Sequence, residues 1–191
     1  MVKKRLVKKT KKENFSTNYF SIFLRYFLII LVAIPNMYLF YFVFTPLTVY
    51  PVYFLLNLFY SASLFGTSIF LGEFEIKIIE ACVAGSAYYL LFLLNLSVPK
   101  IKINTRLKMI FSSFGILLLL NVFRIFLLSL LAFSGSAYFD IAHKLFWYVL
   151  STIFVVGIWF WEVYYFKIKE IPFYEDLKML YRNSIFKIKK K

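Results

Sequence analysis

Long apolar segments are the feature of this sequence that most constrains its fold. Residues 20–44, 82–96, 107–133 and 143–166 are predominantly apolar. A helix needs about 20 apolar residues to cross a bilayer. A water-soluble domain with 62% hydrophobic residues could not present a polar surface. The sequence therefore predicts an all-α integral membrane protein with about four transmembrane helices.

The positive charge of the chain is concentrated in three places. The net charge is +14, and 19 of the 23 Lys and Arg residues lie in residues 3–12, 100–108 and 167–191. With four spans, these segments share one side of the membrane, as the positive-inside rule requires. We therefore expect a basic cytoplasmic segment at 1–19, a membrane-embedded domain at 20–166 and a basic cytoplasmic tail at 167–191. Anionic headgroups, and not nucleic acid, are the expected partners.

The region between the first two spans has a different pattern. Pro46 and Pro51 are expected to end the first helix. Residues 50–65 are apolar but short, which predicts a helix lying in the outer interface; a membrane-inserted position is the alternative. In residues 66–79 charged and apolar residues alternate around Gly72, a pattern typical of a β-hairpin.

Three ionisable residues fall at one depth in this topology. Counted from the inner ends of their helices, Cys82, Arg124 and His143 lie about 25, 24 and 28 Å away at a rise of about 1.5 Å per residue. Glu80 and Asp140 lie nearby in the sequence. Ionisable groups at membrane depth are costly and indicate function by default. We therefore interpret Cys82, Arg124 and His143 as a candidate site near the outer boundary.

These residue types fit nucleophilic catalysis. A nearby cation favours the reactive thiolate of a cysteine. An imidazole can take the thiol proton and return it to a leaving amine, and a fixed guanidinium can stabilise an oxyanion. Asn121 lies one helical turn before Arg124, where it could orient that side chain or contact a substrate. We expect no cofactor and no metal ion at this site.

Each residue also has a purely structural interpretation. Cys82 could be a packing residue in the small-residue stretch 82–87, where helices approach closely. Arg124 could be a structural charge paired with Glu80 or Asp140. His143 could contact headgroups. The common depth of the three residues favours a functional site over three unrelated structural roles.

The motifs as a set resemble those of the exosortase/archaeosortase family of membrane transpeptidases. The chain has Cys82 shortly before Gly85 at the start of one span, Asn121 and Arg124 late in the next, and His143 opening the span after that. The resemblance covers roughly residues 45–161 and is greatest to the compact archaeal branch. The composition, rich in Lys, Ile, Phe and Tyr, also suits an AT-rich archaeal genome.

The resemblance implies a multi-pass cell-membrane enzyme with its active site on the outer side. Such an enzyme cleaves the C-terminal sorting signal of secreted surface proteins and passes the new C-terminus to a lipid acceptor. Cys82 would be the nucleophile, His143 the acid/base and Arg124 the electrostatic stabiliser. The family's common form has Ser or Thr after the Cys; Val83 stands here, and Ser86 could replace the hydroxyl.

Two other functions remain open at this point. In a non-enzymatic multi-pass scaffold, the Cys, Arg and His residues would form a structural polar cluster. A small transporter is disfavoured, because its polar groups would line a path through the bilayer midplane.

Overall fold

The fold is a bundle of apolar helices with a small sheet at one end. The computed structural model describes residues 20–34, 37–99, 101–169 and 171–183. Within these ranges, four helices are long and apolar enough to cross a membrane, which confirms the predicted fold class. The first is α2 (Tyr38–Phe59), and the third is α5 (Ile103–Phe133). The second, Glu80–Ser97, consists of α3 (Glu80–Val83) and α4 (Gly85–Ser97). The fourth, Phe139–Tyr165, consists of α6 (Phe139–Leu145), the π-helix η1 (Phe146–Leu150) and α7 (Ser151–Tyr165).

The first membrane helix differs from the prediction. A short apolar helix, Phe20–Ala33, ends before α2, whose N-cap Met37 has a left-handed backbone with φ 58°. The predicted end of the helix at Pro46 and Pro51 is wrong, because α2 continues through both prolines. Both proline side chains are exposed on the outside of the bundle. Membrane helices tolerate proline in their interior because side chains, ordered water and neighbouring helices can satisfy the freed backbone groups.

The predicted interfacial helix at residues 50–65 is also wrong. Its first ten residues form the end of α2, and Ala62–Phe65 is a strand, β1. Pairing with the next strand satisfies the backbone groups along one edge of this segment, groups that would otherwise be exposed at the interface.

The predicted hairpin is confirmed and gains a third strand. β2 (Ser68–Leu71) and β3 (Phe74–Lys77) pair antiparallel, and β1 adds to the other side of β2. Gly72, in the turn between β2 and β3, has φ 63°, a left-handed conformation that glycine adopts without steric cost. In the strand order β1-β2-β3, β3 is an edge strand of the sheet.

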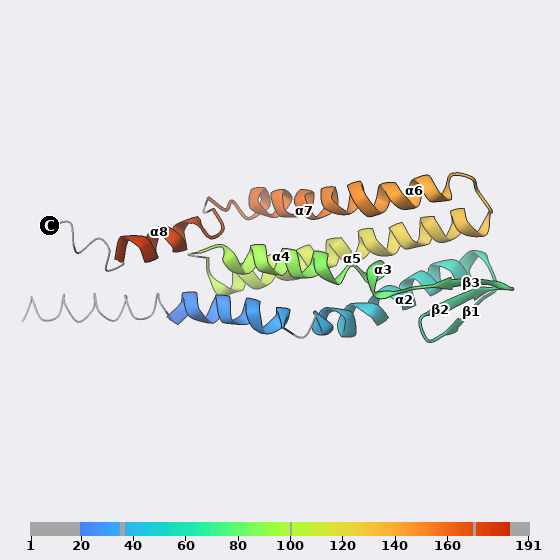
Figure 1. The fold of residues 1–191 in the computed structure, drawn as a ribbon, viewed down its shortest axis with the longest axis horizontal. Coiled ribbons are helices and arrows are strands. Elements are labelled where there is room, and N and C mark those ends of the chain that lie inside the picture. Colours follow the sequence, from blue (N-terminus) through green and yellow to red (C-terminus); the bar gives the residue numbers. More distant parts are fainter. Residues whose placement is uncertain (1–19, 35–36, 100, 170, 184–191) are drawn as a thin grey trace, which may run out of the picture.

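The elements define two ends of the bundle (Figure 1). The sheet and the 134–138 turn lie at one end, called here the sheet end. Helix Phe20–Ala33, residues 98–99 and 101–102, and α8 (Tyr174–Asn183) lie at the other, called the basic end. The first and last described helices share the basic end, as the predicted topology requires. Most of the basic residues behind that prediction lie in 1–19 and 184–191, outside the described residues, so the cytoplasmic location of the basic end stays a prediction.

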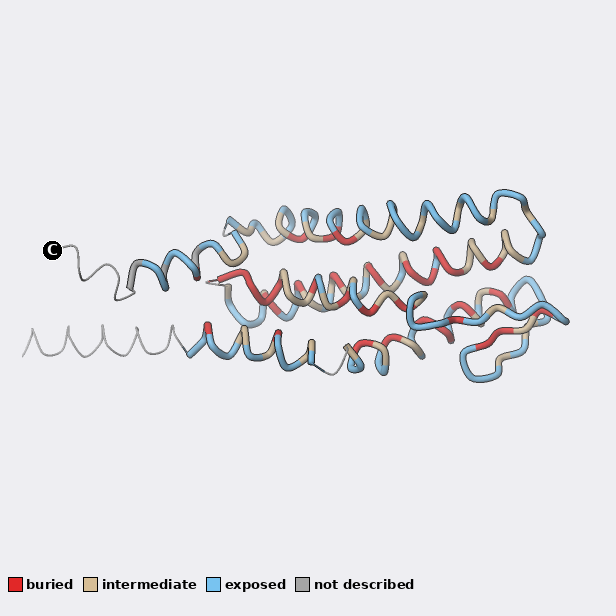
Figure 2. Tube along the Cα trace, viewed as in Figure 1, coloured by how far each residue is buried: buried red, intermediate tan, exposed pale blue. Residues whose placement is uncertain are grey.

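The buried residues line the sides of the helices that face one another (Figure 2), and many of the exposed residues are large and apolar. Tyr88 is fully buried and stacks on Phe44 with ring centroids 3.7 Å apart, and Phe114 packs edge-on against both rings. In contrast, Phe111 and Leu119 on α5 are each 72% exposed. An exterior of this kind is stable in lipid, which solvates apolar side chains directly.

Two arginines fix the basic end. Arg106 donates to the carbonyl oxygens of Leu96 and Val98 at 2.5 and 2.8 Å. Arg25 donates to the Val98 carbonyl at 3.1 Å and forms a salt bridge of 2.8 Å with Asp176 of α8. The last carbonyls of a helix lack amide donors and carry partial negative charge, which guanidinium groups satisfy. These contacts tie helix Phe20–Ala33, α4, α5 and α8 together.

Candidate functional site

The helix that carries Cys82 is interrupted directly after it. The prediction treated residues 82–96 as one helix, but Ala84 has a left-handed backbone with φ 61°, and α4 begins at Gly85. The break withdraws the carbonyl oxygens of Cys82 and Val83 from the helical hydrogen-bond ladder. Within a bilayer, such groups require partners from elsewhere in the protein.

Asn121 and Arg124 on α5 supply those partners. The Asn121 Nδ2 donates to the carbonyl oxygens of Cys82 and Val83 at 3.0 and 3.3 Å. The Arg124 Nη2 donates to the Cys82 carbonyl at 3.0 Å. The two side chains are one turn apart, so they project from the same helix face. The Asn-x-x-Arg spacing therefore matches two consecutive carbonyls of the interrupted helix and holds the Cys82 backbone in place.

Gly85 allows α2 to pack against this break. A Cβ atom at Gly85 would lie 2.7 Å from ring atoms of Tyr41, closer than real side-chain contacts allow. The Tyr41 ring would have to move to accommodate any larger residue. The small residues after Cys82 thus serve close packing, as one structural interpretation predicted, while Cys82 itself remains half-buried with a free thiol.

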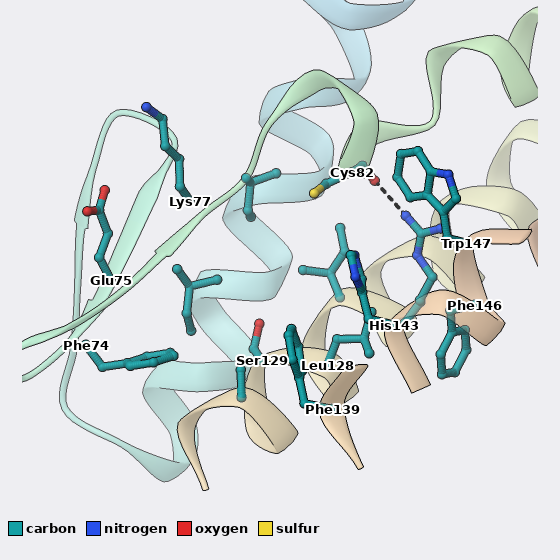
Figure 3. Close-up of a pocket in the computed structure, with 15 residues that line it drawn as sticks. Phe74, Glu75, Lys77, Cys82, Leu128, Ser129, Phe139, His143, Phe146 and Trp147 are labelled. Atoms are coloured by element: carbon teal, nitrogen blue, oxygen red, sulfur yellow. Dashed lines mark hydrogen bonds between the residues drawn. The ribbon is translucent and has the colours of Figure 1, made fainter. Parts of the chain in front are cut away.

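One pocket at the sheet end brings the three predicted catalytic residues together. Cys82, Arg124 and His143 all line a pocket of about 310 Å³ between β3, α5 and the α6–η1 segment. Figure 3 shows the Cys82 sulfur and the His143 ring directed into this pocket. The His143 ring is exposed, stacks on Phe139 with centroids 5.6 Å apart, and lies 6.3 Å from Trp147. Aromatic side chains one turn away on both sides fix the orientation of the imidazole.

Arg124 is held in the pocket wall by neutral groups. Its Nη1 donates to the Ser151 Oγ at 3.1 Å, and that hydroxyl donates to the Phe146 carbonyl at 2.7 Å. Among the described residues, no carboxylate forms a salt bridge with Arg124, and its buried Nε has no hydrogen-bond partner. The guanidinium is therefore a positive charge without an anionic partner, beside the Cys82 thiol.

The remaining predicted residues lie outside the pocket lining. Three of them are exposed and line no part of the pocket: Glu80, Ser86 and Asp140. The structural interpretation in which Glu80 or Asp140 pairs with Arg124 is therefore not the arrangement observed. Ser86 is no longer one helical turn from Cys82, because the break at Ala84 interrupts the helix between them.

Several residues around the site were missed by the sequence analysis. Phe139 and Trp147 could have been found, because they flank His143 at helical spacing of four residues. Ser151 follows a π-helix, whose wider turn changes the register and has no sequence signature. The pocket is also lined by five consecutive residues from β3 onward, residues 74–78, which alternation alone did not place near Cys82.

Comparison with known proteins adds no relative. No protein-family model, no curated protein and no solved structure matches the chain. Within the described ranges, no group of three or more His, Cys, Asp or Glu side chains is arranged to hold a metal ion.

Proposed function

We propose that the protein is a membrane cysteine transpeptidase that acts on the outer face of the bilayer, in the manner of the exosortase/archaeosortase family it resembles. The observation that carries the proposal is the meeting of Cys82, Arg124 and His143 at one pocket, although they come from three separate helices. The pocket lies at the sheet end, opposite the basic end. The positive-inside rule makes that end the outer one.

The first half-reaction uses all three side chains. His143 takes the thiol proton, and the Cys82 sulfur attacks the carbonyl carbon of a substrate peptide bond. Arg124 stabilises the resulting oxyanion with the N–H groups not used by the Cys82 carbonyl and Ser151. The C–N bond then breaks, the imidazolium returns its proton to the leaving amine, and a thioester remains on Cys82.

The second half-reaction regenerates the enzyme. An acceptor hydroxyl or amine, supplied by a lipid, loses its proton to His143 and attacks the thioester carbonyl. The C–S bond breaks, the sulfur recovers a proton, and the substrate's new C-terminus is joined to the acceptor. A substrate whose cleavage site precedes a transmembrane helix would present that site at the outer membrane boundary, at the level of the pocket.

The test is detection of the thioester. A tagged candidate substrate with a C-terminal motif, apolar helix and basic cluster is co-expressed with the enzyme, and adducts are isolated without reductant. We expect a hydroxylamine-sensitive adduct on Cys82 that is missing in Cys82→Ala and depleted in His143→Gln. Normal substrate processing by Cys82→Ala would end the proposal.

The structural-cluster alternative has one observation in its favour. Asn121 and Arg124 both bond the interrupted helix, a role that a non-enzymatic scaffold would also need. The rate of alkylation of Cys82 by iodoacetamide near neutral pH separates the two functions, because only a thiolate reacts fast. The reference is a cysteine placed at the exposed Ser134 in a Cys82→Ala background. A catalytic Cys82 should react faster than this reference and lose its advantage in His143→Gln; a scaffold cysteine should react more slowly.

A further inference from the structure

β3 approaches the pocket by its edge and not by one of its faces. Successive side chains of a strand point to opposite faces of the sheet, so a face would contribute every second residue. Residues 74–78 all line the pocket without interruption. This pattern indicates that the free edge of β3, with its main-chain groups, forms a wall of the pocket. In the part of the chain that the structure describes, the sheet order β1-β2-β3 leaves that edge without a neighbouring strand.

The pairing pattern shows which groups of β3 face outward. The Ile78 amide donates to the Thr67 carbonyl at 3.0 Å, so this pair is hydrogen-bonded. Hydrogen-bonded and non-hydrogen-bonded pairs alternate along an antiparallel ladder. Ile76 is therefore also bonded to β2, whereas Glu75 and Lys77 turn their N–H and C=O groups to the free edge.

The opposite edge of the sheet is different. By the same alternation, Ala62 and Leu64 of β1 turn their amides away from β2. The Ala62 amide is already occupied, since it donates to the Asn57 Oδ1 at 3.2 Å. No residue of β1 lines the pocket. Only the β3 edge combines outward-facing main-chain groups with a place beside Cys82.

We propose that an extended segment of the substrate binds as a fourth strand on the β3 edge, with its main chain paired to Glu75 and Lys77. The inference rests on the proposed function, because the bound strand delivers its carbonyl to the Cys82 thiol. β3 ends at Lys77 and α3 begins at Glu80, so a peptide following this edge reaches the nucleophile within a few residues. Figure 3 shows β3 running directly toward the turn that carries Cys82.

Strand addition determines what kind of substrate is recognised. Main-chain hydrogen bonds supply affinity without reading side chains, and pockets beside the strand supply the specificity. The site should therefore accept many sequences that are extended before the scissile bond, and reject a helical segment. A free edge of this kind otherwise invites pairing with other chains.

The test uses a probe that needs no known substrate. A mixed-sequence hexapeptidyl chloromethyl ketone alkylates a reactive thiol: the Cys82 sulfur displaces chloride and forms a thioether. Its rate is divided by the iodoacetamide rate of the same variant, which removes differences in thiol reactivity. Lys77→Pro deletes one outward N–H, and Lys77→Ala removes the same side chain but keeps that N–H. Leu64→Pro and Leu64→Ala form the matched pair on the β1 edge.

We expect the normalised rate of Lys77→Pro to be about 5-fold below that of Lys77→Ala, the loss of one main-chain hydrogen bond. The Leu64 pair should show no such difference. On the wild-type chain, a probe N-methylated at alternate amides should react more slowly than the unmethylated probe, because it cannot donate those main-chain hydrogen bonds. This comparison tests the inference even if Lys77→Pro does not fold. Equal rates for both probes and both Lys77 variants, with a fast iodoacetamide reaction, would overturn strand addition alone. A slow iodoacetamide reaction would overturn the proposed function and strand addition together.

Discussion

Replacing Asn121 by leucine should destabilise the bundle by about 2 kcal/mol. The substitution keeps the side-chain volume but removes two hydrogen bonds, of 3.0 and 3.3 Å, to the Cys82 and Val83 carbonyls. Interhelical hydrogen bonds in membrane proteins are worth about 0.6 kcal/mol each. The Cys82 carbonyl keeps Arg124 as a donor, but the Val83 carbonyl loses its only side-chain donor among the described residues, and a buried unsatisfied group costs about 1–3 kcal/mol. The lost hydrogen bond to the Cys82 carbonyl and the unsatisfied Val83 carbonyl together give the expected value.

Reversible unfolding in mixed micelles with increasing SDS, followed by tryptophan fluorescence, measures this free energy. A loss of about 2 kcal/mol corresponds to roughly a 30-fold smaller equilibrium constant for folding. Asn104→Leu is the matched control, since Asn104 lies on the same helix but is exposed. If Asn121→Leu unfolds within about 0.5 kcal/mol of the control, the carbonyls of the interrupted helix do not depend on Asn121, and our account of the Asn-x-x-Arg spacing is wrong.

Three further predictions concern the site and the topology. Arg124→Lys should fold but lose at least about 10-fold in Cys82 alkylation rate and substrate processing, because an ammonium cannot bond the Cys82 carbonyl and Ser151 as a planar fork; near-normal processing would show that guanidinium geometry is not needed. Ala84→Gly should stabilise the protein by up to about 1 kcal/mol in the same unfolding assay, because a left-handed residue other than glycine costs about 1–2 kcal/mol. Ala84→Val, its control, should be clearly less stable than wild type. Asn104→Cys in a Cys82→Ser background should react with a membrane-impermeant thiol reagent only after the membrane is opened, and labelling in intact cells would contradict the four-span topology.

Hydropathy was sufficient to predict the number of spanning helices, but not the bounds of the first one or where the helices are interrupted. Four apolar helices follow from the cost of bringing polar residues into lipid, which is large and independent of tertiary contacts. The effect of Pro46 and Pro51 was predicted wrongly, because the rule that proline ends a helix applies to helix interiors in water. Both prolines lie at exposed positions of α2, away from its buried residues.

The site shows the same division between what a sequence encodes locally and what only packing reveals. Equal helical rise was sufficient to place Cys82, Arg124 and His143 at one level. The break at Ala84 could not be predicted, because alanine prefers the helix and the left-handed turn depends on donors from α5. The edge position of β3 also depends on strand order, whereas alternation of residues reports only which face a side chain occupies.

The salt bridge between Arg25 and Asp176 has a consequence for biosynthesis. Arg25 belongs to the first apolar helix, whereas Asp176 belongs to α8, which the ribosome makes after all four spanning helices. Arg25 therefore lacks its acidic partner until the chain has been synthesised through all four of those helices. Assembly at the basic end is completed only when α8 folds back and buries Asp176, which is 1% exposed in the finished protein. The order of synthesis thus makes this salt bridge one of the last contacts that the bundle can form.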